Sequence, residues 1–464
     1  MDKRKNRRQF LSDNFAAATS FGVGAAFLSM SEKIALGDAP QRHSDLQPVR
    51  DETTGLPLLR LPEGFRYKTF GWTGELMTDG TPTPSSHDGM AVIRADGDRL
   101  TLCRNHEVSG HGPHIPTTAA VYDRRAMGGV TRLIFNTKPE TFDGSEVVLS
   151  GTSRNCAGGV TPWGSWLTAE ETVLGPNDKD EEDVLHLFEQ THGWIFEVPA
   201  NGTSDAKPIK DMGRFVHEAI AIDRKTGIVY LTEDRETSSF YRFTPNVRDQ
   251  LAEGGKLEVM EVIGQPDLRG GFINGNRFDV KWHRIDNPTL AHTPGTNDEL
   301  GVYKQGKAKG GSTFARLEGC WFGNDVVYFD ATSGGAAKAG QIWQFDPRSQ
   351  TVRLLFESPS KPILNMPDNL AVSPRGGLIL CEDNDYGPNE YPQCIFGLSQ
   401  LGHIELFAEN NVVLNGEHNQ ITGDFRAKEW AGATFSPDGE WLFVNIQTPG
   451  FTCAITGPWK ETIL

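Results

Sequence analysis

The sequence predicts an all-β protein built from repeated β-hairpins, and three observations favour this fold class. The chain of 464 residues contains 51 glycines and 27 prolines, which mark frequent turns. Its apolar content of 37% is enough for a large core and too high for a disordered chain. One motif, an apolar run, a turn and a second apolar run, recurs six times. The length suits one large β architecture or two to three smaller domains.

The repeated motif has the composition of a β-hairpin. In the third copy, AIAI (219–222) leads through the turn DRKTG (223–227) to VYLT (229–232). Aromatic-rich strand pairs follow several copies, and units of about four strands around an axis are typical of a propeller. Six copies therefore predict a six-bladed β-propeller, with a β-sandwich or two unrelated β-domains as the alternatives. The copies begin at His87, Cys156, His217, Glu318, Pro367 and Ala431.

Two long insertions, residues 174–193 and about 247–317, separate some of the units. In a propeller such insertions emerge on one face and shape what enters the channel, and we expect loops and short helix in them. The acidic run 178–183 is expected to be a solvated loop, because it lacks the glycine and distal glutamate of an EF-hand. We expect one propeller domain over residues 40–464.

The first 39 residues have the features of a twin-arginine export signal. Five basic residues, including the pair Arg7 and Arg8, precede an apolar stretch over 15–30 and small residues over 35–39. The stretch is too short and too weakly apolar to predict a membrane span. We therefore expect a periplasmic or secreted protein with no membrane contact after cleavage. A basic amphipathic first helix is the alternative.

Net charge, cysteine spacing and the absence of two common motifs limit the possible partners, disulfides and catalytic mechanisms. A net charge of -16 argues against nucleic acid, because phosphate backbones need a basic face. Six cysteines in an exported protein permit disulfides, although the spacing is wide and no CxxC pair occurs. The sequence also has no GxSxG nucleophile motif and no GxxxxGK[ST] phosphate loop.

Polar side chains stand at the starts and ends of the repeated motifs. In a propeller the innermost strands line the channel, so these groups are expected to converge at its mouths. So many carboxylates near one axis would repel one another unless cations held them. Oxygen ligands suit Ca²⁺, and carboxylates with a thiolate and imidazole suit iron or zinc. The groups are His87-Asp88, Asn105-His106-Glu107, Cys156, Glu170-Glu171, His217-Glu218, Glu233-Asp234, Glu318, Asp330, Asp368-Asn369 and Glu382-Asp383-Asn384.

Each of these groups also has an ordinary structural explanation. A cysteine such as Cys156 is often a small buried hydrophobe, and a lone His217 is more often a core hydrogen-bonding residue than a ligand. Asp368 could cap a turn. The metal hypothesis therefore rests on recurrence at equivalent positions and not on any single residue.

Several of the motifs match a known family. They are NHE (105–107), YDRRAMGGVTR (122–132), NCAGGVTPWGSWLTAEE (155–171), GRFVHEA (213–219), VYLTED (229–234) and MPDNLAVSPRGGLILCED (366–383). These segments resemble the PhoX family of bacterial alkaline phosphatases. The resemblance extends from about residue 55 to the end, and NCAGGxTPWGxWLTxEE is long and specific. The family's twin-arginine export agrees with the predicted signal.

The resemblance implies a phosphomonoesterase that uses a calcium–iron cluster on the axis of a six-bladed propeller. Two ferric ions share a cysteine ligand, and calcium ions help to bind phosphate, so that the cofactors are Fe³⁺ and Ca²⁺. The expected metal ligands are Cys156, Glu107, Glu170, Glu171, Glu218, Glu233, Asp234, Asp368, Glu382 and Asp383. The expected catalytic residues are Cys156, Glu171, Glu233, Arg154 and Arg235.

The two arginines would hold phosphate oxygens in bidentate contacts, although surface salt bridges are an equal alternative for each. We expect a monomer that acts on small phosphate monoesters. Two other functions stay open at this point. One is a calcium-dependent lactonase, which would hold one calcium and no iron. The other is a propeller without catalytic activity that binds a protein or glycan.

Overall fold

The structure confirms the all-β class. The computed structural model describes residues 46–179, 184–384 and 392–464. The expected export signal (1–39) and part of the acidic run (180–183) lie outside the described residues. Within those residues strands β1 to β28 dominate. The helices described there are α3 (Gly301–Ala308), in the expected second insertion, and three short 3₁₀ helices at Lys210–Met212, Leu251–Glu253 and Trp459–Glu461.

The strands pair in antiparallel sheets that follow the chain around the molecule. The first sheet contains β4 (His87–Asp96), β5 (Arg99–His106), β6 (Gly128–Asn136) and β7 (Thr141–Thr152), and the second β8 (Asn155–Val160), β9 (Ser165–Glu170) and β10 (Ile195–Pro199). A nine-stranded sheet follows, with the order β11 (His217–Ile222), β12 (Val229–Glu233), β13 (Tyr241–Pro245), β14 (Gly255–Val262), β15 (Arg277–Arg284), β19 (Thr351–Glu357), β18 (Gln341–Asp346), β17 (Val326–Ala331) and β16 (Leu317–Gly323).

Three further sheets complete the described chain. One has the order β1 (Gln47–Val49), β2 (Leu59–Leu61), β23 (Ile404–Asn410), β22 (Cys394–Leu398), β21 (Leu378–Glu382) and β20 (Pro367–Val372). Another contains β26 (Trp430–Phe435), β27 (Leu442–Ile446), β28 (Phe451–Thr456) and β3 (Arg66–Phe70). The smallest pairs β24 (Val413–Asn415) with β25 (Thr422–Asp424).

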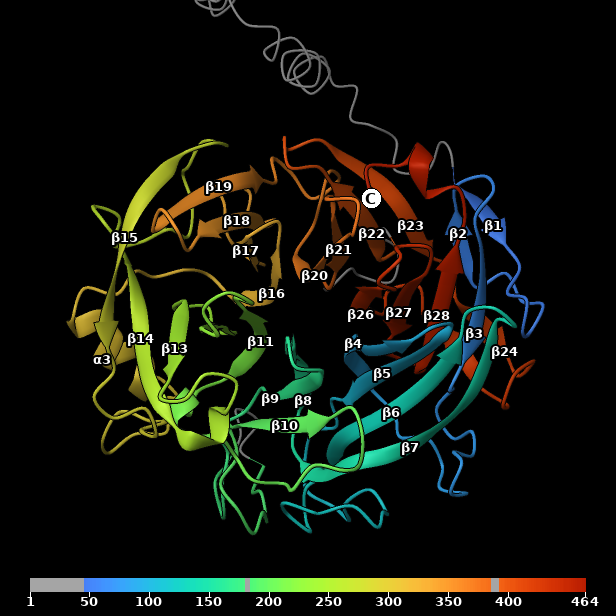
Figure 1. Cartoon of the computed structure of the whole chain (residues 1–464), viewed down its shortest axis with the longest axis horizontal. Helices are drawn as coiled ribbons and strands as arrows, with labels where there is room; N and C mark the ends of the chain where they lie inside the picture. Colours follow the sequence, from blue (N-terminus) through green and yellow to red (C-terminus); the bar gives the residue numbers. More distant parts are fainter. Residues whose placement is uncertain (1–45, 180–183, 385–391) are drawn as a thin grey trace, which may run out of the picture. The chain divides into compact units, whose positions relative to one another are not determined.

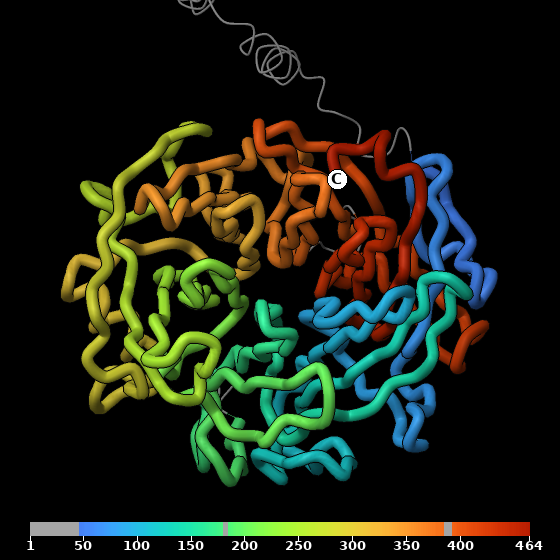
Figure 2. Tube along the Cα trace, in the orientation of Figure 1, coloured from blue at the N-terminus to red at the C-terminus, as the bar shows by residue number. Residues whose placement is uncertain are grey.

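Six strands surround the centre of the molecule, which gives a propeller-like arrangement (Figure 1). These inner strands are β4, β8, β11, β16, β20 and β26, and each opens one copy of the repeated motif. Each packs against the next in chain order, and β26 packs against β4. The ring is closed by an N-terminal strand, because β3 pairs with β28 with Phe70 opposite Thr452. Figure 2 shows the first described segment beside the C-terminal strands.

The inner strands share a local irregularity near their starts. A β-bulge shifts the register in every one of them, for example between His217 and Ile220 in β11. Such a bulge re-aims the side chains beside it. The same slip occurs in β4, β8, β16, β20 and β26. The strands also approach closely, since a Cβ atom on Gly159 would lie 2.1 Å from the carbonyl oxygen of Ile220.

One backbone hydrogen bond recurs in the same place in every unit. The N–H of the residue just after the second strand, which we call the return strand, donates to a carbonyl just before the inner strand. This bond fixes both strand ends at the centre. The six bonds run from Glu107 to Ser86 (2.9 Å), Glu171 to Arg154 (2.8 Å), Asp234 to Val216 (3.1 Å), Thr332 to Arg316 (2.8 Å), Asp383 to Met366 (3.0 Å) and Gln447 to Glu429 (3.2 Å).

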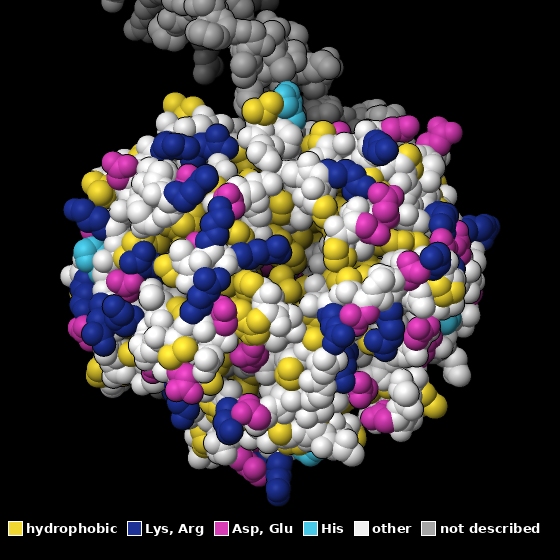
Figure 3. All heavy atoms as spheres, in the orientation of Figure 1, with side chains coloured by type: hydrophobic (Ala, Val, Ile, Leu, Met, Phe, Trp, Pro, Cys, Tyr) yellow, Lys and Arg dark blue, Asp and Glu magenta, His cyan; other side chains and the backbone are white. Residues whose placement is uncertain are grey.

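Apolar side chains fill the space between neighbouring sheets. Every residue of β11 and β12 is buried, which explains why AIAI and VYLT carry no exposed polar residue. Tyr230, Phe329 and Trp343 belong to one such layer. Figure 3 shows apolar side chains around the centre of the face drawn there. All six cysteines lie in the described ranges, where they are buried and form no disulfide with one another. In the described ranges, the helices are too short or too polar to cross a membrane.

Three glutamates at the ends of return strands bind backbone N–H groups. Glu382 accepts from Asn365 and Cys394, at 2.8 and 3.1 Å. Glu233 accepts from the N–H of Ser239 at 3.1 Å and from a tyrosine hydroxyl. Each carboxylate therefore connects the end of its return strand to an adjacent segment of the same polypeptide through hydrogen bonds.

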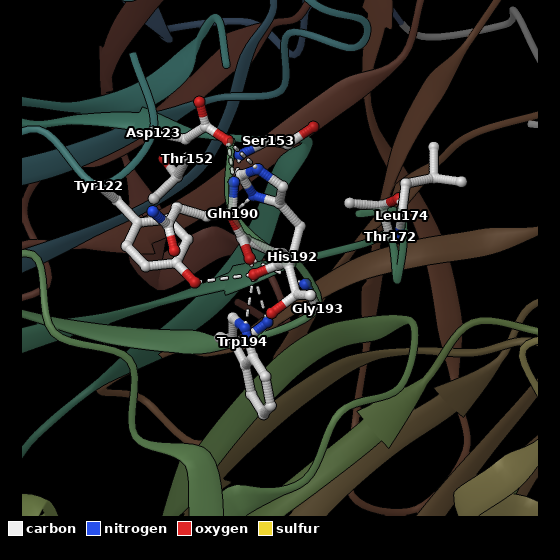
Figure 4. A network of polar contacts seen from close by, with 12 residues as sticks. Tyr122, Asp123, Thr152, Ser153, Thr172, Leu174, Gln190, His192, Gly193 and Trp194 are labelled. Carbon is white, nitrogen blue, oxygen red and sulfur yellow. Dashed lines mark hydrogen bonds and ion pairs between the residues drawn. The ribbon is translucent and has the colours of Figure 1, made fainter. Parts of the chain in front are cut away.

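Glu170 belongs to the most extensive of these networks, and Figure 4 shows its partners Ser153, His192, Gly193 and Trp194. Its Oε1 accepts from Ser153 N at 2.9 Å, and its Oε2 accepts from Gly193 N at 2.9 Å and Trp194 N at 3.1 Å. The buried His192 lies between two carboxylates. Its Nδ1 is 2.7 Å from Glu170 Oε1, and its Nε2 is 3.3 Å from Asp123 Oδ2. This arrangement stabilises a charged imidazolium.

We expect His192 to make the stability depend on pH. Burial opposes its charged form, but Glu170 and Asp123 outweigh this effect and raise the pKa of His192 to about 9. An unfolded histidine titrates near pH ~6.5, so the folded state binds the extra proton between these values. The stabilisation, on the order of 3 kcal/mol, is present below pH ~6.5 and is lost as the pH rises through about 9.

Urea unfolding of the wild type and of His192→Gln between pH 6 and 10 measures this contribution. The wild type should lose more free energy of unfolding than the variant over that range. Equal slopes in the two proteins would contradict the assignment of the charge to His192.

Candidate metal centre

Eight buried or nearly buried acidic and thiol side chains meet at the starts of the inner strands. We call them the acid cluster. They form three groups, two of which overlap, and within each group one possible ligand atom from every member lies within 4.8 Å of the others. Shared Glu218 links two of the groups. The groups are Cys156, Glu171 and Glu218; Glu218, Glu318 and Asp368; and Asp88, Glu107 and Glu429.

The inner strands supply five members of the acid cluster from one equivalent position. Each is the second residue of its strand and lies within the bulge, where the register shifts between the first and fourth residues; the five are Asp88, Cys156, Glu218, Glu318 and Asp368. Successive side chains of a strand point to opposite faces, so the first residue of each strand points away from the acid cluster.

The histidines at first positions are structural. The ring nitrogen Nε2 of His87 lies 2.9 Å from the carbonyl oxygen of Pro84, and that of His217 lies 3.0 Å from the carbonyl oxygen of Gly213. Burial lowers the pKa of both rings. Each ring makes a hydrogen bond with the backbone segment that directly precedes its inner strand, and so fixes the position of that segment.

The other members come from the two ends of the recurring backbone bond. Glu107 and Glu171 are the residues just after return strands, and Glu429 is the carbonyl residue before β26. Asp234 and Asp383 occupy the same place as Glu107 after their own return strands. The negative charge of Asp383 helps to raise the pKa of Glu429, which places it at the edge of the cluster.

Cys156 lies among the carboxylates. Its Sγ is 3.0 Å from Glu218 Oε1 and 3.7 Å from Asp88 Oδ1. Burial, together with the negative charges of Asp88 and Glu218, raises the pKa of the thiol. A neighbouring cation would reverse this effect, because it favours the thiolate.

The carboxyl groups of the acid cluster have pKa values above the ordinary range, so they keep their protons to a higher pH than exposed carboxyl groups do. Burial raises the pKa of Asp88 to about 6 and that of Glu107 to about 7, and neighbouring carboxylates add to both shifts. Burial and mutual repulsion raise the pKa well above the ordinary value in Glu171, Glu218, Glu318, Asp368 and Glu429. Glu218 Oε2 is buried and has no hydrogen-bond partner among the described residues. Carboxylate oxygens and a thiol sulfur this close together are a candidate set of metal ligands.

Two arginines border the acid cluster at equivalent positions. Arg154 contacts Glu171 at 2.9 Å and Glu107 at 3.4 Å, and the charge of Glu171 raises its pKa most. Arg316 contacts Glu318 at 2.6 Å and Asp234 at 3.0 Å. Both arginines have a left-handed φ of 47° two residues before a cluster member. The fold therefore fixes the backbone positions from which these two arginine side chains extend.

A pocket of about 550 Å³ lies beside the cluster. Glu171 and Asp234 line it together with Arg154, Arg235 and Arg316. Arginine cations beside carboxylates in one pocket suit an anionic group that binds together with metal ions.

The structure brings most of the expected site residues together. Cys156, Glu107, Glu171, Glu218 and Asp368 are members of the cluster, and Asp234 and Asp383 lie at its edge. Arg154 and Arg235 line the pocket. Glu170, Glu233 and Glu382 are not brought to the cluster, since they bind the backbone groups described above.

Two residues at the site, Glu429 and Arg316, were not expected from the sequence. Asp88 and Glu318 were among the polar groups expected to converge at the channel, but not among the expected metal ligands. Asp88 and Glu318 hold the same motif position as Cys156 and Glu218, so this equivalence was available in the sequence. Arg316 precedes Glu318 by two residues, as Arg154 precedes Cys156. Glu429 lies before the sixth copy, where the motif begins at Ala431, and no sequence pattern pointed to it.

Comparison with known proteins identifies the family. The family model described as alkaline phosphatase PhoX matches residues 44–148 and 135–450. No curated protein matches the chain. The structure of Pseudomonas fluorescens PhoX in complex with vanadate, a transition state analogue, is similar over 89% of this chain and 98% of that chain, with 17% identity and a TM-score of 0.61.

A gluconolactonase from Xanthomonas campestris, XC5397, is 11% identical over 86% of this chain and 89% of that chain, with a TM-score of 0.42. The PhoX family model spans most of the chain, and this confirms the resemblance seen in the motifs. The protein belongs to the PhoX family of alkaline phosphatases and is a phosphoric monoester hydrolase.

Proposed function

We propose that phosphomonoester hydrolysis takes place at the acid cluster, which holds Fe³⁺ and Ca²⁺ on the axis of a six-bladed propeller. The observation that carries this proposal is the gathering of seven carboxyl groups and one thiol, all buried or nearly buried, in three groups. Such a set repels itself when ionised, and bound cations remove the repulsion.

The six-bladed architecture is supported by the sixfold recurrence of the inner strands, their bulges and the backbone bond. In this architecture the nine-stranded sheet is two blades. Strand β15 joins them because it pairs with β14 on one side and β19 on the other. The cluster then lies where the inner strands of the blades begin.

The donor atoms indicate which groups would hold which ion. Cys156, Glu171 and Glu218 combine sulfur with oxygen and suit iron. The other two groups offer only carboxylate oxygen, which suits calcium. Glu218 belongs to two of the groups, and its Oε2 has no hydrogen-bond partner among the described residues, so this oxygen would be available to hold a cation.

Bound cations would neutralise the charge that develops on a phosphoryl group and would make an oxygen nucleophile available near neutral pH. The chain itself supplies the remaining positive charge. Arg154 and Arg316 are fixed by cluster carboxylates at the pocket wall, where their guanidinium groups can bind phosphoryl oxygens. Arg235 lines the same pocket.

Other properties of the protein are part of the proposal. The substrates are small phosphate monoesters, and the vanadate complex of the Pseudomonas fluorescens relative supports phosphoryl chemistry in this fold. The N-terminal motif supports twin-arginine export to the periplasm or beyond. The protein acts as a monomer without nucleic acid or membrane partners.

Metal dependence is the first test. The protein, exported from a host with an intact twin-arginine pathway, should release phosphate from a chromogenic monoester in excess calcium and should lose nearly all activity with a calcium chelator. Elemental analysis should find iron and calcium. Calcium without iron, and no phosphate release from the folded protein, would favour a lactonase instead.

Cys156→Ala should abolish iron binding and phosphatase activity, because it removes the sulfur donor of the cluster. The matched control is Cys103→Ala, which removes another buried thiol, in β5, away from the cluster. Iron content per folded protein and the hydrolysis rate decide the outcome. Full iron and full activity in Cys156→Ala would refute the assignment.

The neighbouring glutamates at the end of β9 should behave oppositely. Glu171→Gln should remove activity with little loss of stability, since it discharges a cluster member. Glu170→Gln should lower the free energy of unfolding by roughly 3 kcal/mol, because its carboxylate accepts several buried hydrogen bonds.

Thermal unfolding and activity, measured on both variants after metal loading, separate these effects. An inactive but fully stable Glu170→Gln, or an active Glu171→Gln, would show that the two roles are exchanged.

A further inference from the structure

An ion pair on the wall of the pocket joins residues that are far apart in the chain. Arg235 Nη1 donates to Glu299 Oε2 at 2.6 Å, and both side chains line the pocket beside Glu171 and Asp234. The side chain of Arg235 is 29% exposed and that of Glu299 is 16% exposed. Glu299 therefore has an ordered place in the pocket wall and is not a surface charge.

The loop that carries Glu299 is built around Asp298. The carboxylate of Asp298 accepts hydrogen bonds from Thr293 N (2.9 Å), Thr293 Oγ1 (2.6 Å), Leu300 N (3.1 Å) and Lys304 Nζ (2.6 Å). Although burial opposes it, these bonds lower the pKa of Asp298. The carboxylate thus fixes the chain on both sides of Glu299, directly before α3.

Glu299 itself has an unusual backbone. Its φ is +57°, in the left-handed region that few residues other than glycine adopt. Its N–H donates to His292 Nδ1 at 3.1 Å. The loop thus holds Glu299 in a costly conformation in which its carboxylate meets Arg235, and such strain concentrates at functional sites.

Arg235 has a fixed backbone as well. Its N–H donates to the carbonyl oxygen of Glu233 at 3.2 Å, and its own carbonyl accepts from Arg316 N at 2.9 Å. It directly follows Asp234, at the edge of the acid cluster. The long side chain still has many rotamers, and binding an anion through it would require that freedom to be lost.

We propose that Glu299 is a positioning residue, which orients the guanidinium of Arg235 so that it binds the phosphoryl oxygens of the substrate. The inference rests on the proposed function of the acid cluster. Holding the planar donor group in place before the substrate arrives lowers the entropic cost of binding. The alternative is that Glu299 acts only by its negative charge, which would repel the anionic substrate.

These two roles predict opposite results for Glu299→Gln. If Glu299 positions Arg235, KM for a chromogenic phosphate monoester and the inhibition constant of inorganic phosphate should both rise, by about tenfold. If Glu299 only repels the substrate, both constants should fall. A fall in either constant, or no change, would overturn the proposal.

A double-mutant cycle tests whether the effect passes through Arg235. In the Arg235→Ala background, Glu299→Gln should change the phosphate inhibition constant by less than about twofold, because the group that it orients is gone. Equal effects in both backgrounds would overturn the proposal. Arg235→Lys replaces alanine if that variant does not fold, since lysine keeps the charge but not the planar donor geometry.

Two controls separate this inference from other failures. Glu258→Gln removes a similarly exposed arginine–glutamate pair, Arg242 with Glu258, on β13 and β14, and should leave KM unchanged. Thermal unfolding of Glu299→Gln should match the wild type. A wild type without phosphatase activity refutes the proposed function, whereas an active wild type with an unaltered Glu299→Gln variant refutes only the role of Glu299.

Discussion

The structure depends on one backbone hydrogen bond that recurs in six units. Each copy holds the end of a return strand against the start of an inner strand, and so brings the residues at these two strand ends close together. No single bond of this kind contributes more than about 1 kcal/mol. Repeated around a ring, however, the bond fixes the backbone positions of Glu107 and Glu171 in the acid cluster and of Asp234 and Asp383 at its edge.

The sequence was sufficient for the fold class and for the existence of the acid cluster, but not for its membership. Pairs such as Glu170 and Glu171 are equivalent by composition, and strand alternation requires that they point to opposite sides. Which member faces the centre depends on the bulge in the paired inner strand, and a bulge has no reliable sequence signature. Glu429 was missed for a related reason, because the sixth unit contributes its acid from the preceding loop.

The adjacent acids divide stability and chemistry between them. Glu170, Glu233 and Glu382 satisfy backbone donors and hold the sheet edges, whereas the residues that follow them, Glu171, Asp234 and Asp383, lie in the acid cluster or at its edge. A carboxylate whose bonds are satisfied by the protein has little left to offer a cation, and a ligand must stay unsatisfied until the cation arrives. Because the two kinds of carboxylate are adjacent in the sequence, strand ends that are held by hydrogen bonds surround the mutually repelling carboxylates of the acid cluster.

The pairing of β3 with β28 has a consequence for biosynthesis. The sheet that carries β26 is completed by segments from opposite ends of the sequence, and β26 packs against both β4 and β20. Contacts of such long range form late in folding, because the intervening chain must be ordered first. A nascent chain in which β26 to β28 have not yet been synthesised therefore lacks this wall of the acid cluster, and the cluster is complete only once these strands have folded against β3 and β4.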